Sequence, residues 1–401
     1  MAKYVPGILT KDLMIETKVK EPELPRFESI QGLFQSDGPR ITILLPRYQP
    51  GAQGKSMTGL LKTYLRDLTH QLTTLKVAEP VIAGLLKPLQ DLSEDEQSAS
   101  GSRLGRVIFR SRDVFQQFDL LGPVAARFML GAYFQIRPIL SDLYLPPEFY
   151  VLKLSKKSVE LRRCAHLRSQ TVELPKGVPQ TLDEALAFEP PDHDLENRSA
   201  CGVSSGAMRG IRFGTGSGRE SQPAHLADFY RIVDRGIVTL LHSGNPPLIL
   251  AGVGEDTAAY RMINTYLNLL SHSIHGSPNQ SLTEPDLLQH AYSIVRAERV
   301  GRTAASLAEL NERLSPARFT SDLDTILGAA AEGRVDKLYI DADAQIKGRL
   351  PSTTPSPRWN GAEEDLLNVA VVEAMLHGGF AFELPANKMP DGATISAVFR
   401  Y

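Results

Sequence analysis

The stretch FYVLKLSKKSVELRRC, residues 149–164, carries the clearest secondary-structure pattern in this chain. Apolar and polar side chains alternate in two runs, Phe149–Leu154 and Ser158–Arg162, and this alternation is typical of half-buried strands. The short connection Ser155-Lys156-Lys157 joins the two runs in the manner of a tight turn. The stretch therefore predicts an antiparallel β-hairpin, and the sequence SQTVELP after it predicts a third strand.

Downstream of this hairpin the hydrophobic period disappears. Residues 196–222, ENRSACGVSSGAMRGIRFGTGSGRESQ, are rich in Gly and Ser and are locally basic. Pro223 then stands where a long amphipathic helix is predicted to begin, with apolar residues at helical spacing as far as Leu241. The following PPLILAGV predicts a buried strand. A glycine-rich basic segment thus leads directly into a rigid helix.

Upstream, residues 41–65 have the sequence ITILLPRYQPGAQGKSMTGLLKTYL, with the strand–loop–GKS–helix order of a P-loop. A P-loop needs Gly four residues before its Gly-Lys-Ser so that backbone N–H groups surround a phosphate. Here that position is Gln49, and the adjacent Pro50 removes a backbone donor. We interpret Lys55 as a cation of an ordinary loop aimed at RNA or solvent. A nucleotide-binding regulator that uses Gly54-Lys55-Ser56 stays the least favoured alternative.

Helical and strand patterns alternate along the remaining sequence, which predicts a mixed α/β (α+β) fold of three domains. Each domain is expected to be a small mixed sheet with flanking helices, over residues 1–146, 147–275 and 276–401. The first is predicted to have helices over 58–75 and 80–92 and strands over 41–46, 106–109, 114–120 and 134–136. The last is predicted to have helices over 284–299, 307–313, 322–332 and 362–376 and strands over 337–340, 380–383 and 393–401.

Composition excludes several classes of protein. The 401 residues have a net charge of -2 and two cysteines, Cys164 and Cys201, which exclude a disulfide framework and a cysteine-based zinc site. No apolar run approaches the roughly 20 residues of a membrane helix, and the N-terminus does not resemble a signal peptide, so a cytoplasmic protein is expected. A nearly neutral chain that binds RNA must use local basic patches.

Several motifs suggest catalytic or metal chemistry but lack the context that it needs. Residues 202–206, GVSSG, match a hydrolase nucleophile elbow, yet no strand is predicted before them. Neither Asp192-His193-Asp194 nor the pair His272 and His275 has further ligands at motif spacing, so no metal and no cofactor is expected. The basic side chains remain, and they predict phosphate contacts. The predicted RNA-binding residues are Lys55, Arg103, Arg106, Arg110, Arg209, Arg212, Gly214, Gly216, Gly218, Arg219 and Gln222, with Lys62 and Arg66 in neighbouring segments.

In order and in pattern, these segments resemble the bacterial branch of the archaeal/eukaryotic class-1 release factor and Pelota superfamily. GPRITILLP and GSRLGRVIFRS resemble strands of its first domain, and FYVLKLSKKSVELRRCAHLRSQTVELP resembles the opening of its middle domain. GTGSGRESQPAHLADFYRIVDRGIVTLL stands where release factors carry a Gly-Gly-Gln loop and its long helix, and PPLILAGV is similar to the next strand. DLDTILGAAAEGRVDKLYI and GATISAVFRY resemble a Pelota-type C-terminal domain.

The sequence departs from release factors at two motifs. Gln222 is separated from Gly216 and Gly218 by Arg219-Glu220-Ser221, so no Gly-Gly-Gln is formed, and the stop-codon-reading Asn-Ile-Lys-Ser is absent. The resemblance implies a factor that binds the ribosomal A site (rRNA) and acts in stalling, rescue or hibernation by binding rather than catalysis. P-site tRNA and a translational GTPase such as elongation factor Tu are candidate partners. The alternative is a peptidyl-tRNA hydrolase that uses residues 214–222, with Gln222 as its catalytic residue.

Overall fold

The structure, a computed structural model, describes residues 24–34, 36, 38–46, 57–94, 105–122, 124–165, 167–188, 222–276, 283–349 and 363–401. The chain divides into two compact units. The first unit combines Met1–Tyr144 with Thr303–Tyr401, and the second is Leu145–Arg302. No helix in the described parts is long and apolar enough to span a bilayer.

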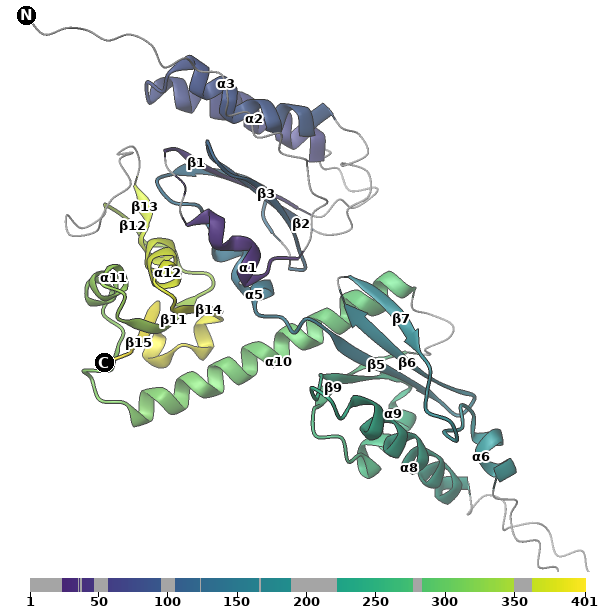
Figure 1. The fold of residues 1–401 in the computed structure, drawn as a ribbon. Helices are drawn as coiled ribbons and strands as arrows, with labels where there is room; N and C mark the ends of the chain where they lie inside the picture. The colour runs from purple at the N-terminus through teal and green to yellow at the C-terminus, as the bar shows by residue number, and fades with distance from the viewer. Residues whose placement is uncertain are drawn as a thin grey trace, which may run out of the picture. The chain divides into compact units, whose positions relative to one another are not determined.

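The N-terminal section of the first unit contains a four-stranded antiparallel sheet in the order β3-β2-β1-β4. Helices α2 and α3 cover one face of this sheet, and α1 and α5 cover the other (Figure 1). Successive side chains of β1 point to opposite faces of the sheet, and both faces are covered. Ile41, Ile43 and Leu45 pack against α2 and α3, whereas Leu44 packs in the core on the other face. The elements are α1 (Phe27–Ile30), η1 (Gln31–Leu33), β1 (Arg40–Leu45), α2 (Met57–Thr74), α3 (Glu79–Glu94), β2 (Gly105–Arg110), β3 (Phe115–Leu120), β4 (Arg127–Gly131) and α5 (Arg137–Leu143).

The C-terminal section of this unit contains a second four-stranded sheet, in the order β10-β15-β11-β14. Helix α12 is buried along most of its length, and it packs with α11 against β11, β14 and β15. The elements are β10 (Phe319–Thr320), α11 (Leu323–Ala331), β11 (Val335–Asp341), β12 (Lys347–Gly348), β13 (Glu364–Asp365), α12 (Leu366–Leu376), β14 (Phe380–Leu384), η2 (Ala386–Lys388), η3 (Pro390–Gly392) and β15 (Ile395–Phe399). Strands β12 and β13 form a separate two-stranded ladder.

One hydrophobic core joins these two sections, and a polar seam runs beside it. We call the contacts of residues 132–137 with the C-terminal section the seam. Arg137, at the start of α5, lies at its centre. Its guanidinium donates to Asp365 (3.0 Å), to Glu383 (3.3 Å) and to the carbonyls of three residues. These are Asp341, Ala342 and Ala344, so the five N–H donors of the guanidinium all have acceptors.

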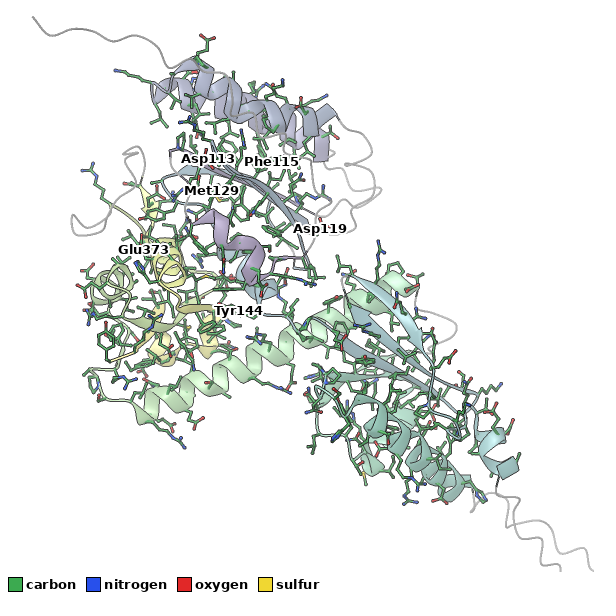
Figure 2. All side chains as sticks on the ribbon, viewed as in Figure 1. Asp113, Phe115, Asp119, Met129, Tyr144 and Glu373 are labelled. Atoms are coloured by element: carbon green, nitrogen blue, oxygen red, sulfur yellow. The ribbon has the colours of Figure 1, made fainter. Side chains whose placement is uncertain are left out.

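The backbone of residues 132–136 bonds to side chains rather than to another strand. The Asn368 side-chain amide receives a bond from the Ile136 N–H (3.0 Å) and donates to the Phe134 carbonyl (2.9 Å). Glu364 accepts from the Ala132 N–H at 2.6 Å, and the Tyr133 hydroxyl donates to Glu373 at 2.8 Å (Figure 2 labels Glu373 on α12). The predicted strand over 134–136 is therefore wrong, because side chains satisfy the backbone groups that a strand would pair.

Glu364 gives the seam a pH dependence. Burial raises the pKa of its carboxyl group, and this effect outweighs the lowering by the Ala132 N–H and by Arg40. Because the folded protein binds this proton more tightly than the unfolded chain does, the protonated group contributes stability. This contribution is complete below the pKa of a glutamate in the unfolded chain, about 4.3, and it is lost as the pH rises through the pKa in the folded protein. Between pH 4 and 7, roughly, the wild type should therefore lose stability relative to Glu364→Gln, whose amide keeps the acceptor oxygen. Denaturant unfolding at both pH values measures the difference in stability between the wild type and Glu364→Gln. If this difference did not change with pH, Glu364 would not be the source of the pH dependence.

The second unit is a five-stranded sheet in the order β7-β6-β5-β8-β9, in which β5, β8 and β9 are parallel. Helices α8 and α9 cover one face, and the first part of α10 packs on the other, where the rings of Phe149 and Tyr292 meet at 4.8 Å. The elements are β5 (Phe149–Ser155), β6 (Ser158–Ala165), β7 (Arg168–Val172), α6 (Leu182–Phe188), α8 (Gln222–Leu241), β8 (Leu248–Gly252), α9 (Gly254–Ile263) and β9 (Leu269–His275). Helix α10 (Glu284–Arg313) belongs to this unit as far as Arg302 and to the first unit from Thr303.

Several element predictions are confirmed and others are wrong. The hairpin over 149–162, the helices on either side of residue 77 and the terminal strand are present. The two helices predicted over 284–299 and 307–313 are one helix, α10, in which Gly301 faces open space and is tolerated. The sequence did not predict β4, α9 or β9. The three larger sheets fall within the three predicted ranges, and the division into three domains stays a prediction.

Candidate nucleic-acid interface

One edge of the sheet in the second unit gathers the ends of parallel strands. Strands β5 and β8 pair in parallel with Leu154 opposite Gly252, so their carboxyl ends lie side by side. After this edge β5 turns into Lys156 and Lys157, and β8 leads through Val253 into α9. In sheets of this kind, ligands bind outside the carboxyl ends of parallel strands. We call this region the carboxyl edge.

The hairpin turn presents two lysines at the carboxyl edge. The Ser155 hydroxyl oxygen accepts from the N–H groups of Lys157 (3.2 Å) and Ser158 (3.0 Å), which fixes the turn. The Lys156 carbonyl also accepts from the Leu182 N–H at 3.1 Å, so the turn is tied to the start of α6. Both lysine side chains are exposed. The turn therefore holds two positive charges in a fixed place.

Helix α8 begins at the same edge. A short connection joins its last residue, Leu241, to β8, so α8 runs back along the sheet and its N-terminus lies near the carboxyl end of β8 (Figure 1). Its first residue is Gln222, one position before the predicted start at Pro223. The residues predicted to face the core, including Phe229, Val233 and Ile237, are buried. A helix N-terminus favours anions because its first N–H groups have no partners within the helix.

Buried contacts hold α8 in place. Asp234 accepts from the Tyr260 hydroxyl (3.0 Å), the Thr265 N–H (3.1 Å) and the Thr265 hydroxyl (2.5 Å). These bonds join α8 to α9 and to the segment before β9. Gly236 allows close packing, because a Cβ there would lie 2.5 Å from a Val178 methyl. The helix that follows the glycine-rich segment therefore has a fixed position within its own unit.

Asp256, in the first turn of α9, adds a buried carboxyl group to this edge. Burial raises its pKa, whereas the nearby Tyr230 hydroxyl and the charge of Lys156 lower it, in that order. Glu255 also lies in this first turn, so at this edge the preference for anions comes from Lys156, Lys157 and the N-terminus of α8 rather than from α9. Among the described residues, no group of His, Cys, Asp and Glu side chains could hold a metal ion. His272 and His275 lie three residues apart on β9, so they point to opposite faces.

Most of the predicted RNA-binding residues lie outside the described residues, so their placement stays a prediction. They are Lys55, Arg103, Arg209, Arg212, Gly214, Gly216, Gly218 and Arg219. Gly54 and Ser56, and the GVSSG motif over 202–206, also lie outside. Gln222 is placed only by its backbone, as the first residue of α8.

Arg106 and Arg110 are described, and both are buried within the protein. Arg106 on β2 donates to Asp119 on β3 at 3.1 Å (Figure 2 labels Asp119), and the two residues are directly opposite in the strand register. Arg110 donates to the carbonyls of Leu85 (2.9 Å), Gly84 (2.7 Å) and Val114 (3.2 Å), and so ties α3 to the sheet. A phosphate contact would require each guanidinium to leave these partners. The structure therefore gives both arginines a structural role.

Arg110→Ala is expected to destabilise the first unit by about 2–4 kcal/mol, because it leaves three carbonyls without their donor and opens a cavity under α3. Denaturant unfolding followed by circular dichroism measures this loss. Arg66→Ala is the matched control: its side chain is 80% exposed, and its effect should stay within about 0.5 kcal/mol. Equal stability of both variants would show that the Arg110 contacts contribute nothing.

Helix α2 presents the exposed basic side chains that Arg106 and Arg110 do not provide. Lys62, Arg66 and His70 are exposed and recur at every fourth position, so they share one face of the helix. Arg66 also contacts Asp67 at 3.3 Å at the surface. The charge pattern of the sequence included Lys62 and Arg66, but His70 was missed. Helical spacing alone would have found it.

Comparison with known proteins relates part of the chain to one family. Residues 148–334 match the model of bacterial archaeo-eukaryotic release factor family 3. No curated protein matches the sequence. Among solved structures, the archaeal translation termination factor aRF1 is 13% identical, with a TM-score of 0.24 over 93% of this chain and 96% of that chain. Pelota of Archaeoglobus fulgidus is 11% identical, with a TM-score of 0.37 over 75% of this chain and 80% of that chain.

Dom34 of S. cerevisiae, described as a translation termination-like factor involved in RNA quality control pathways and interacting with Hbs1, is 11% identical, with a TM-score of 0.29 over 72% of this chain and 73% of that chain. These structural similarities are distant, and the family match concerns residues 148–334. The resemblance expected from the order of segments is confirmed. The comparisons thus relate residues 148–334, just under half of the chain, to bacterial archaeo-eukaryotic release factor family 3.

Proposed function

We propose that this protein binds the ribosomal A site as a translation factor in the cytoplasm and acts by binding, in stalling, rescue or hibernation, rather than by hydrolysing peptidyl-tRNA. The family match over residues 148–334 carries this proposal. Its matched region includes the carboxyl edge with Lys156, Lys157 and the anchored helix α8. These are suited to rRNA phosphates, which bind at exposed cations and helix N-termini.

The departure from Gly-Gly-Gln supports binding over catalysis. Three residues separate Gln222 from the nearest glycine, and Gln222 already belongs to α8. In the Gly-Gly-Gln arrangement the glutamine follows the glycines at once. On the same resemblance, a translational GTPase such as elongation factor Tu and P-site tRNA are proposed as partners. Peptidyl-tRNA hydrolysis is the second candidate, because an anchored α8 would also hold Gln222 in a fixed place.

Co-sedimentation with purified ribosomes tests the binding that both candidates require. Lys156→Glu with Lys157→Glu should weaken binding, and the combined Arg209→Ala, Arg212→Ala and Arg219→Ala variant should do the same, by about 1–3 kcal/mol per charged contact. Gln222→Ala should bind like the wild type. Binding should also weaken steeply with salt, because phosphate contacts release counterions.

Peptide release supplies the decisive measurement. Ribosomes loaded with labelled peptidyl-tRNA should keep their peptide when the purified protein binds. Release that is lost in Gln222→Ala, with binding intact, would establish the hydrolase instead. Absence of ribosome binding at low salt would refute both candidates.

A further inference from the structure

The C-terminal sheet brings three arginines to one of its ends. The strand order is β10-β15-β11-β14, and the pairing places the starts of β10, β11 and β14 beside the end of β15. Arg318 precedes β10, Arg400 follows β15, Arg334 precedes β11 and His377 lies before β14. Across the sheet, the residues come in the order Arg318, Arg400, Arg334, His377. We call the first three the arginine row.

Main-chain bonds fix the backbone of the arginine row. The Phe399 N–H donates to the Arg318 carbonyl, and the Arg400 N–H donates to the Arg334 carbonyl, both at 2.9 Å. Neighbouring strands lie about 4.8 Å apart, so the two outer arginines are roughly 10 Å apart at their backbones. This spacing suits contacts to more than one phosphate of a strand.

Each guanidinium of the arginine row is held by the protein but retains further donors. Arg318 donates through Nε to the Phe399 carbonyl (3.0 Å), and Arg400 donates through Nη2 to the His377 carbonyl (2.9 Å). Arg334 donates to Glu332 at 2.7 Å and lies over the Phe399 ring at 5.6 Å. A guanidinium has five N–H donors, so these contacts position the groups without using them up.

Capping of a helix C-terminus explains only part of the arrangement of these arginines. Arg400 caps the C-terminus of α12 through the His377 carbonyl, which is an ordinary structural role for an arginine. That bond accounts for one donor of one arginine. It does not explain why Arg318 and Arg400 stay exposed with carbonyl partners, while the carboxylate of Glu332 pairs with Arg334. Asp336 also lies near this end, where its charge acts on Tyr339.

Exposed aromatic rings accompany the arginine row. Tyr401 beside Arg400 is 74% exposed. Phe380, the first residue of β14, packs against Phe27 (6.5 Å) and Tyr144 (6.4 Å) but remains 43% exposed, so part of its ring is accessible. Aromatic rings next to arginines are the combination that binds single-stranded nucleic acid, because bases stack on rings while guanidiniums contact phosphates. An acidic peptide would use the charges but would not need the rings.

We propose that the arginine row binds the phosphates of a single-stranded RNA segment, with Phe380 and Tyr401 available for its bases. The proposal rests on the proposed ribosomal function for the source of that RNA, a loop of rRNA. It adds an RNA contact in the C-terminal section, away from the residues that the sequence patterns single out.

Fluorescence anisotropy with a labelled single-stranded RNA of twelve uridines tests the arginine row directly. The combined variant Arg318→Gln and Arg400→Gln should bind more weakly than the wild type. The slope of log affinity against log salt should become shallower by about 0.7 for each phosphate that the variant no longer binds. Arg313→Gln is the control, because this arginine is 75% exposed, belongs to the same unit and causes the same change in charge per residue. Equal losses of affinity in the control, or no RNA binding by the wild type, would overturn the proposal.

A photo-crosslinking residue in place of Tyr401 provides a second test on intact ribosomes. Crosslinks to rRNA support the proposal, whereas crosslinks confined to ribosomal proteins overturn it in favour of an acidic protein partner. Arg318→Lys with Arg400→Lys keeps the charges if the glutamine variant fails to fold, and it should retain the salt slope. The oligonucleotide measurement does not involve ribosomes, so a failure of the arginine row and a failure of the proposed ribosomal function give different results.

Discussion

Arg137→Met should lower the free energy of unfolding of the first unit by about 3–5 kcal/mol. The substitution removes one buried cation that contacts the carboxylates of Asp365 and Glu383, both of which are little exposed. The carbonyls of Asp341, Ala342 and Ala344 lose their donor as well. Methionine fills much of the same volume, so the loss reports polar contacts rather than a cavity.

Denaturant unfolding monitored by circular dichroism measures this loss, with Arg66→Met as the exposed control from the same unit. A double-mutant cycle with Asp365→Asn should give a coupling energy, because the two side chains contact each other at 3.0 Å. If Arg137→Met left the stability unchanged, the two sections of the first unit would be independent of the seam. That result would favour three separately folding domains.

Asp234→Ala should destabilise the second unit by about 2–4 kcal/mol. The side chain is buried and serves three donors, which belong to Tyr260 and Thr265. Without it, the buried hydroxyl of Tyr260 loses its acceptor, and the two donors of the exposed Thr265 no longer tie this segment to α8. Amide hydrogen exchange along α8 should accelerate, because the bonds that tie this helix to α9 are removed.

Asp228→Ala provides the control on the same helix. Its carboxylate is exposed and pairs with Arg231 at 2.5 Å at the surface, where ion pairs contribute little. Asp234→Asn should retain one acceptor and fall between the two variants. Slow exchange along α8 in Asp234→Ala would show that apolar packing alone anchors the helix.

The sequence predicted the helices and strands in which buried and exposed residues alternate with the regular period of that element. The hairpin of β5 and β6 alternates strictly, and α8 has apolar residues on one face, so both could be found from the sequence. Strand β9 could not, because LLSHSIH lies at a sheet edge and is half polar. Helix α9 is short and weakly amphipathic, and its place depends on β8 and β5. Both elements are specified by contacts that are distant in sequence.

The candidate site shows a different limit. Charge is visible in a sequence, but burial of that charge is not. Arg106 and Arg110 formed a basic cluster, yet Asp119 lies opposite Arg106 only once β2 and β3 pair. The carbonyls that hold Arg110 belong to α3, about 25 positions earlier. By contrast, Lys156 and Lys157 are exposed because they form a tight turn at the surface. The hairpin pattern in the sequence predicts this exposure.

The first unit is built from two stretches of chain that are far apart in the sequence, and this affects its synthesis. Residues 145–302 separate its two sections, so the ribosome making this chain completes the first section well before the last. At 5–20 residues per second, roughly 10–30 s pass before the first residue of the last section is added. During that interval Arg137 has no carboxylate to pair with, and the apolar surface that α12 will cover remains open. The second unit is therefore synthesised completely before the first unit can close the core that its two sections share.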